Sequence, residues 1–271
     1  MKLNQDGLDK NDKERYQLAI NVRNYLVEGN RVIGDPGEGL RQTLIELEKE
    51  RDNQDVSILD WGMKNPELEA QISMTKAGIE GEVKLCEYLQ TLLKHDDKLN
   101  GIVAFASLSY DTGKAADLGY IPDTDTLLVY GRNLLIIDAK NLKLKANQQI
   151  ILVGNTLVDP DKGKEILTVN PSTQVWEKIM ADRGIPIDSI DGYVCIVNET
   201  PVEIIRDEEW YASNIKPIHI CELRDVLEGW VANKEGNTLY LNMLTEIATA
   251  QIKKEKDLSF DVNEIKRKYG I

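Results

Sequence analysis

Apolar residues follow two patterns along the chain: short unbroken runs, and longer segments in which they recur at every third or fourth position. The runs predict strands and the periodic segments predict helices. Strands are expected at about 102–108, 122–130, 133–141, 150–153, 156–158, 192–197 and 217–221, with 192–197 closing the sheet. Helices are expected at about 12–30, 39–52, 66–94, 170–181, 222–233, 239–255 and 261–269. The alternation predicts an α/β protein with a helical N-terminal region (1–75), a core that carries the strands (76–222) and a helical C-terminal region (223–271).

Strands 122–130 and 133–141 are separated by a Gly-Arg-Asn turn and predict a hairpin. The hairpin brings the start of its first strand beside the end of its second, so Asp125 is expected across from Asp138. Alternate residues of a strand share a face, so Asp138 and Lys140 are expected side by side. The hairpin therefore predicts two carboxylates and a lysine at one end of the sheet.

Charged groups at the end of a buried strand require a partner or a bound ion, because burying an isolated charge is costly. Two explanations stay open. One is a salt bridge where the strand reaches the surface. The other is a metal-binding acid beside a lysine that handles a water molecule. Asp123 lies on the same strand face as Asp125 and is the alternative acid at that position.

A third acid lies on a predicted helix. Ile79, Val83 and Cys86 form part of one apolar stripe, and Glu82 falls on that apolar side. The nearby Gly81 permits close approach of the backbone. Glu82 is therefore either a metal ligand that points inward or a boundary residue whose carboxylate reaches water.

The ordered motifs resemble those of the nuclease-related domain family, NERD, which belongs to the PD-(D/E)xK nuclease superfamily. The resemblance covers roughly residues 76–200 and rests on Gly78-x-x-Gly81-Glu82, Asp125 ahead of an apolar strand, Ile137-Asp138-Ala139-Lys140-Asn141, and Asn170-Pro171-Ser172-Thr173-Gln174. It implies a central mixed β-sheet flanked by helices, as in PD-(D/E)xK nucleases, with the helical regions as additions. The family usually has Glu where this chain has Asp138, and Asp is one methylene shorter.

The resemblance also implies a cofactor and roles for individual residues. A Mg²⁺ or Mn²⁺ ion is expected at oxygen ligands, which hard divalent cations prefer. Its expected ligands are Asp125 and Asp138 directly, Glu82 directly or through water, and the carbonyl of Ala139. Lys140 is expected to orient or help to deprotonate the attacking water. For Gln174 two interpretations stay open: it holds a water or a phosphate near the acids, or it satisfies free backbone groups at a helix start.

Two functions are compatible with these motifs. The first is a metal-dependent nuclease that hydrolyses phosphodiester bonds of nucleic acid, with DNA favoured over RNA. The second is a catalytically silent protein of the same fold that binds a protein partner through acidic surfaces. The net charge of −13 weighs against a broad DNA-binding surface. Residues 35–60 and residues 199–229 each carry eight acids and three bases, which makes them the candidate partner surfaces.

The remaining composition bounds the cellular setting. No run of apolar residues is long enough to span a bilayer, so a cytoplasmic protein without membrane contact is expected. The three cysteines, Cys86, Cys195 and Cys221, lie singly among apolar residues and are expected to be reduced core residues. The terminal helices are expected to be able to pair between chains and form a homo-oligomer.

Overall fold

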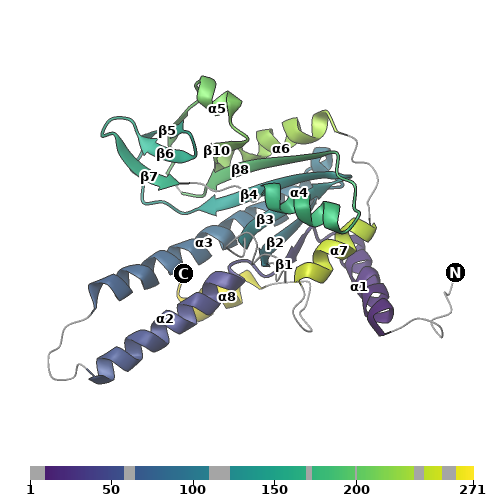
Figure 1. The fold of residues 1–271 in the computed structure, drawn as a ribbon, viewed down its shortest axis with the longest axis horizontal. Coiled ribbons are helices and arrows are strands. Elements are labelled where there is room, and N and C mark those ends of the chain that lie inside the picture. Colours follow the sequence, from purple (N-terminus) through teal and green to yellow (C-terminus); the bar gives the residue numbers. More distant parts are fainter. Residues whose placement is uncertain are drawn as a thin grey trace.

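A six-stranded mixed sheet forms the centre of the molecule (Figure 1). The computed structural model describes residues 10–57, 65–109, 123–168, 173–198, 200–234, 241–251 and 261–271. Its helices are α1 (Lys10–Val27), α2 (Glu38–Ser57), α3 (Pro66–His95), α4 (Thr173–Asp182), α5 (Glu208–Ala212), α6 (Leu223–Ala232), α7 (Leu241–Gln251) and α8 (Val262–Tyr269). Its strands are β1 (Val32–Gly34), β2 (Val103–Ser109), β3 (Asp123–Tyr130), β4 (Asn133–Lys140), β5 (Gln149–Val153), β6 (Thr156–Asp159), β7 (Lys164–Thr168), β8 (Ser189–Ile196), β9 (Glu203–Ile205) and β10 (Ile215–His219).

The central sheet has the order β1-β2-β3-β4-β8-β10. Strands β2, β3 and β4 form an antiparallel meander, whereas β4, β8 and β10 are parallel to one another. The apolar run of β4 is buried because neighbouring strands and helices cover both of its faces. Strand β4, which ends with Asp138, Ala139 and Lys140, therefore lies between β3 and β8.

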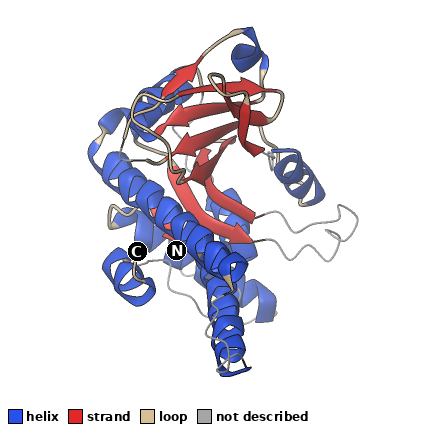
Figure 2. Cartoon of the chain, turned by 90° about the vertical axis from the view of Figure 1, so that its left-hand side faces the viewer, coloured by secondary structure: helices blue, strands red, loops and turns tan. Residues whose placement is uncertain are grey.

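Helices cover both faces of this sheet (Figure 2). Leu135 and Ile137 of β4 belong to the core that contains residues of α3 and α6. Leu134 and Ile136 belong to the opposite core, which contains residues of α1, α4 and α7. The alternation along β4 therefore decides which helices each side chain meets.

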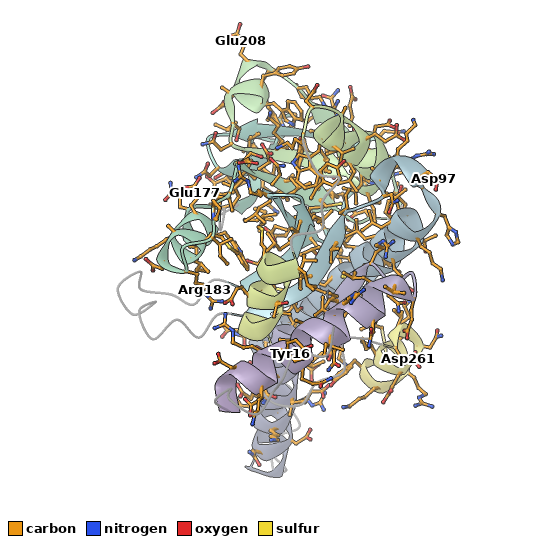
Figure 3. All side chains as sticks on the ribbon, turned by 90° about the vertical axis from the view of Figure 1, so that its right-hand side faces the viewer. Tyr16, Asp97, Glu177, Arg183, Glu208 and Asp261 are labelled. Carbon is orange, nitrogen blue, oxygen red and sulfur yellow. The ribbon has the colours of Figure 1, made fainter. Side chains whose placement is uncertain are left out.

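Helix α4 is fixed to the sheet and to α7. The indole of Trp176 is fully buried and donates to the Thr124 hydroxyl of β3 at 2.9 Å. Arg183, which is labelled in Figure 3, lies just after α4 and donates to the Glu246 carbonyl of α7 at 3.1 Å. The start of α4 lies over the parallel half of the sheet, because a Cβ atom at Gly192 of β8 would be 3.3 Å from Thr173 Cγ2.

A second sheet of four strands lies beside the central one, in the order β7-β6-β5-β9. Ile150 and Leu152 of β5 share an apolar cluster with Val194 and Ile196 of β8. The small sheet therefore covers the end of β8 that α4 leaves uncovered.

Helices α2 and α3 lie together and project from the rest of the molecule (Figure 1). A separate apolar cluster joins them to α8 and includes Leu44, Ile79 and Ile265. Tyr269 of α8 lies against the guanidinium of Arg41, which is 5.5 Å from the ring centroid. The C-terminal helix is thereby attached to the N-terminal half of the chain.

The α/β class and most of the predicted elements are confirmed, including the hairpin of β3 and β4, with ends shifted by a few residues. Four elements are missing from the prediction: β1, β7, β9 and α5. The N-terminal region is not purely helical, since β1 joins the central sheet and α3 runs through the boundary expected at 75/76. The expectation that 192–197 closes the sheet is wrong, because β8 lies between β4 and β10.

Cys86 and Cys195 are buried as expected, whereas Cys221 is exposed, so its assignment to the core is wrong. Helices α1 and α7 pack against each other within this chain. Pairing of the terminal helices between chains stays a prediction. Across the described ranges, every helix is too short or too polar to cross a membrane.

Candidate active site

Asp125 and Asp138 meet where the β3–β4 hairpin ends. The last paired residues are Thr126 and Ile137, so the next position of the register sets Asp125 opposite Asp138. Asp125 Oδ2 accepts a hydrogen bond from the backbone N–H of Ala139 at 2.7 Å. Both aspartates are partly buried, and they lie together as the hairpin predicts.

Lys140 completes this group. Its Nζ lies 2.5 Å from Asp138 Oδ1, and both side chains retain a little over a quarter of their exposure (27% and 28%). Burial opposes the charge of Lys140, but Asp138, Asp125 and Glu82 outweigh it and raise the pKa of the ammonium. Lys140 is therefore held in its charged form.

Glu82 lies in a polar cradle on the other side of the hairpin end. Only 5% of the residue is exposed, and its Oε2 accepts from the Ser107 hydroxyl at 2.5 Å and from the Gly37 N–H at 2.8 Å. The Gly37 N–H also lies 2.7 Å from Ser107 Oγ, so the three groups form one closed network. A buried carboxylate that receives such bonds has a fixed direction.

The backbone of this cradle adopts uncommon conformations. Ser107 has φ of +46° and Gly37 has φ of +72°, both in the left-handed region. A serine in this region costs conformational energy that neighbouring interactions have to offset. At Gly37 a Cβ atom would also approach Ile79 Cγ2 to 3.1 Å, so the position favours glycine. The two conformations aim an N–H and a hydroxyl at the same oxygen.

The loop that carries Gly37 is held by Arg41, which is 7% exposed. Arg41 donates to the Pro36 carbonyl and pairs with the Asp35 carboxylate. The sequence Asp35-Pro36-Gly37 is typical of a turn. This turn reaches Glu82 through the Gly37 N–H.

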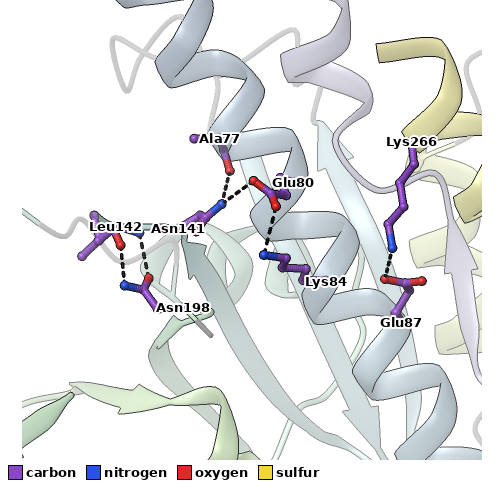
Figure 4. Close-up of polar contacts among 8 residues, drawn as sticks. All are labelled: Ala77, Glu80, Lys84, Glu87, Asn141, Leu142, Asn198 and Lys266. Atoms are coloured by element: carbon purple, nitrogen blue, oxygen red, sulfur yellow. Dashed lines mark hydrogen bonds and ion pairs between the residues drawn. The ribbon is translucent and has the colours of Figure 1, made fainter. Parts of the chain in front are cut away.

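Gly81 lets α3 approach the end of β4. A Cβ atom there would lie 3.1 Å from Asn141 Cβ and 3.3 Å from Val197 Cγ2. Asn141 is itself fixed, because its Nδ2 donates to the Ala77 carbonyl at 3.2 Å and to Glu80 Oε2 at 3.0 Å (Figure 4). The short contact explains how the helix brings Glu82 close to the hairpin.

Asn198 ties together the ends of the parallel strands. Its Oδ1 accepts from the Leu142 N–H at 3.0 Å, and its Nδ2 donates to the Leu142 carbonyl (Figure 4). The backbone carbonyl of Asn198 also lies 3.1 Å from Nε2 of the buried His219. These bonds hold the chain just beyond Lys140.

The electrostatics of the group centre on Asp125. Burial, the charge of Glu82 and the charge of Asp138 raise its pKa well above the usual 3.8, against the opposing effect of Lys140. Three carboxylates and one ammonium leave the group with excess negative charge. Such a group binds a proton or a cation more readily than an isolated aspartate does.

Two further residues that the sequence singles out belong to β3 and α4. Asp123, the alternative to Asp125, begins β3 opposite Ser109. Gln174 is exposed in the first turn of α4 and lines a polar cavity on the parallel half of the sheet. Residues 170–172 of the Asn-Pro-Ser-Thr-Gln motif lie outside the described residues, so only Thr173 and Gln174 of that motif are placed.

Asp125, Asp138, Glu82 and the Ala139 carbonyl are all oxygen donors of the kind that Mg²⁺ and Mn²⁺ prefer. Among the described residues, no three His, Cys, Asp or Glu side chains lie close enough to form a metal site as they stand. Lys140 pairs with Asp138, and Glu82 Oε2 accepts from Ser107 and Gly37. The donor chemistry fits a divalent ion, and binding requires these side chains to adjust.

Sequence reasoning missed Gly37, Ser107 and Arg41. The only signal in the sequence was the Asp-Pro-Gly turn, and its contact with Glu82 was not predictable because the two segments are far apart in the sequence.

Comparisons with known family models, curated proteins and solved structures find no match.

Proposed function

We propose that this chain is a divalent-metal-dependent nuclease that hydrolyses phosphodiester bonds, with DNA favoured over RNA, and that its fold is of the PD-(D/E)xK type seen in the nuclease-related domain family. The observation that carries the proposal is the meeting of Asp125, Asp138 and Lys140 at one end of the β3–β4 hairpin, with Glu82 buried beside them. A strand end that served packing alone would not need this combination of charges.

The metal is Mg²⁺ or Mn²⁺ in this proposal. Asp125 and Asp138 are its direct ligands, the Ala139 carbonyl is a further ligand, and Glu82 binds directly or through water. A bound divalent ion neutralises charge at the phosphate and lowers the pKa of its water. The raised pKa of Asp125 supports this assignment, because burial and the carboxylates of Glu82 and Asp138 disfavour its charge, and a bound cation would favour it.

Lys140 acts as a charged donor. Its raised pKa keeps the proton on Nζ, so it orients the attacking water and offsets charge on the phosphate oxygens. Lys140 and Asp138 lie on the same strand face, so a small change in the rotamer of Lys140 moves its ammonium from Asp138 towards the attacking water. Hydrogen bonds from Ser107 and Gly37 hold the Glu82 carboxylate in a fixed direction.

The second candidate is a catalytically silent protein that binds a partner. Its supporting observation is that Asp138 and Glu82 already have partners within the chain. Helix α2, which projects with α3, contains much of the acidic segment 35–60 and is the candidate surface (Figure 1).

A cleavage assay separates the two candidates. Purified protein is incubated with linear, nicked and single-stranded DNA in Mn²⁺ or Mg²⁺, with EDTA as the blank. Lys140→Ala is compared with Lys178→Ala, a control at an exposed lysine of α4. Metal-dependent cutting that Lys140→Ala abolishes and Lys178→Ala retains supports the nuclease.

Thermal unfolding with and without Mn²⁺ gives a second readout. An ion that binds only the folded protein raises its stability by RT ln(1 + [Mn²⁺]/Kd), so the rise grows with the concentration of the ion. Asp138→Asn is expected to abolish that rise. Absence of cutting together with absence of a Mn²⁺ effect would favour the partner-binding protein.

A further inference from the structure

A polar cavity of about 440 Å³ lies between α4, α5 and the strands β8 and β10. Helices α4 and α5 are marked in Figure 3 by Glu177 and Glu208. The residues that the argument uses are Gln174, Glu177, Tyr211, Asn214 and Lys216. None of them has a part in the candidate active site apart from the open assignment of Gln174.

The cavity lies on the same face of the sheet as Asp138. Gly192 of β8 faces the start of α4, because a Cβ atom there would lie 3.3 Å from Thr173 Cγ2. Gly192 pairs with Ile136, which also faces α4, and Asp138 is two residues further along that strand. Strand spacing and rise place Asp138 roughly 8 Å from Gly192. A group bound in the cavity would therefore adjoin whatever is bound at Asp138.

An exposed aromatic ring forms one wall. Tyr211 is 66% exposed, and its ring meets that of Trp210 edge-on at 5.0 Å. Trp210 is itself fixed, since Arg206 and Lys216 lie 4.9 and 5.2 Å from its ring centroid. A large exposed tyrosine on such a support is suited to stack on a flat ligand.

The charges of the cavity suit a neutral ligand. Glu177 is a carboxylate of the cavity lining, and the ammonium of Lys216 lies 5.2 Å from the centroid of the Trp210 ring. A phosphate would be repelled by the Glu177 carboxylate, whereas a neutral heterocycle would not be. The side-chain amides of Gln174 and Asn214 each offer donors and an acceptor, which match the edge of a nucleobase.

The overall charge points the same way. A chain with a net charge of −13 gains little affinity from phosphates in general. Affinity for nucleic acid then has to come from metal at the active site and from contacts with bases. Stacking supplies such affinity without requiring a particular sequence.

We propose that this cavity is a nucleobase-binding subsite, in which Tyr211 stacks on an unpaired base that adjoins the phosphate at Asp138. The choice of ligand rests on the nuclease function proposed above. Gln174 and Asn214 bind the edge of that base, so the subsite favours single-stranded or locally unpaired nucleic acid.

The test measures binding by fluorescence anisotropy in EDTA, which prevents metal-dependent cutting. The probes are a short labelled single-stranded DNA and an abasic strand of the same length. The variants are Tyr211→Ala, Tyr211→Phe and, as a control, Met74→Ala, which removes another large exposed side chain on the projecting part of α3. Circular dichroism confirms that each variant is folded.

We expect the strand with bases to bind more tightly than the abasic strand. Tyr211→Ala is expected to weaken binding of the strand with bases by about five-fold or more and to leave the abasic strand unchanged. Tyr211→Phe and Met74→Ala should behave as the unaltered chain. Equal binding of both probes, or Tyr211→Ala binding as the unaltered chain does, would overturn the subsite.

Cleavage is measured separately, with the same protein preparations in Mn²⁺ and without EDTA, so the two proposals fail separately. Base-dependent binding without cleavage would retain the subsite and reject the nuclease. Cleavage with no effect of Tyr211→Ala on binding would retain the nuclease and reject the subsite.

Discussion

Replacing Asp125 by asparagine should make the protein more stable at neutral pH. Burial disfavours the charge of Asp125, and the carboxylates of Glu82 and Asp138 disfavour it further, so the pKa of Asp125 is raised. Asparagine keeps an oxygen that can accept from the Ala139 N–H, so the fold loses only the charged character of that bond. A site whose removal stabilises the fold is typical of function rather than packing.

The expected gain follows from the charges. Directly opposed residues of antiparallel strands have Cβ atoms about 5 Å apart, which corresponds to roughly 3 kcal/mol for two like charges at an effective dielectric constant of about 20. Attraction to Lys140 cancels about one of the two repulsions. A neutral acceptor is weaker than a charged one by about 1 kcal/mol. With screening by solvent, the free energy of unfolding should rise by about 1–2 kcal/mol.

The gain should depend on pH. The folded state binds a proton at Asp125 more readily than the unfolded state, since the folded pKa is raised. The stability of the unaltered chain therefore falls as pH rises above the unfolded pKa of about 3.9 towards the raised folded pKa, and then levels off. Asp125→Asn lacks this decline, so its advantage grows with pH over that window.

The assay is thermal and urea unfolding at several pH values, with Asp161→Asn as a control at an exposed aspartate. Each kcal/mol corresponds to a rise in Tm of about 2–4 °C for a chain of this size. Mn²⁺ should stabilise the unaltered chain and leave Asp125→Asn unaffected. The reasoning is refuted if Asp125→Asn is less stable than the unaltered chain at pH 8, or if its advantage is the same at every pH.

Two further substitutions test the support of Glu82. Ser107→Ala removes the hydroxyl between Glu82 and Gly37 and should cost about 1–3 kcal/mol of unfolding free energy, measured in urea; an unchanged midpoint would contradict the closed network. Gly81→Val should cost at least about 2 kcal/mol and weaken Mn²⁺ binding, because its side chain meets the fixed Asn141. A stable Gly81→Val variant with unaltered Mn²⁺ binding would show that α3 can shift without disturbing the site.

Local patterns predict much of the candidate site. Alternation along β4 places Asp138 and Lys140 on one face, and the short turn after Tyr130 sets Asp125 opposite them. Helical spacing alone places Glu82 on the buried side of α3. Each of these relations depends on residues that are close in sequence or joined by a hairpin.

The remaining features depend on contacts between distant segments. Strand β1 is three residues long, too short to show a period, and its partner β2 is far along the chain. Ser107 has a positive φ, and its hydroxyl contacts Glu82 of α3 and the Gly37 N–H, both distant in sequence, so serine itself gives no sign of this conformation. The chemical roles of Asp125, Asp138, Lys140, Glu82 and Gln174 stay predictions.

The attachment of Arg41 to Tyr269 has a consequence for the order of folding. Glu82 is held by a loop that Arg41 organises, and Arg41 in turn packs on a residue more than two hundred positions away. Contacts of such separation form late, because their loop-closure entropy is lost before they stabilise the fold. Local opening of α8 should therefore release the Gly37 amide to hydrogen exchange while the central sheet stays protected. The acidic group would then be among the last parts of the molecule to assemble and among the first to loosen.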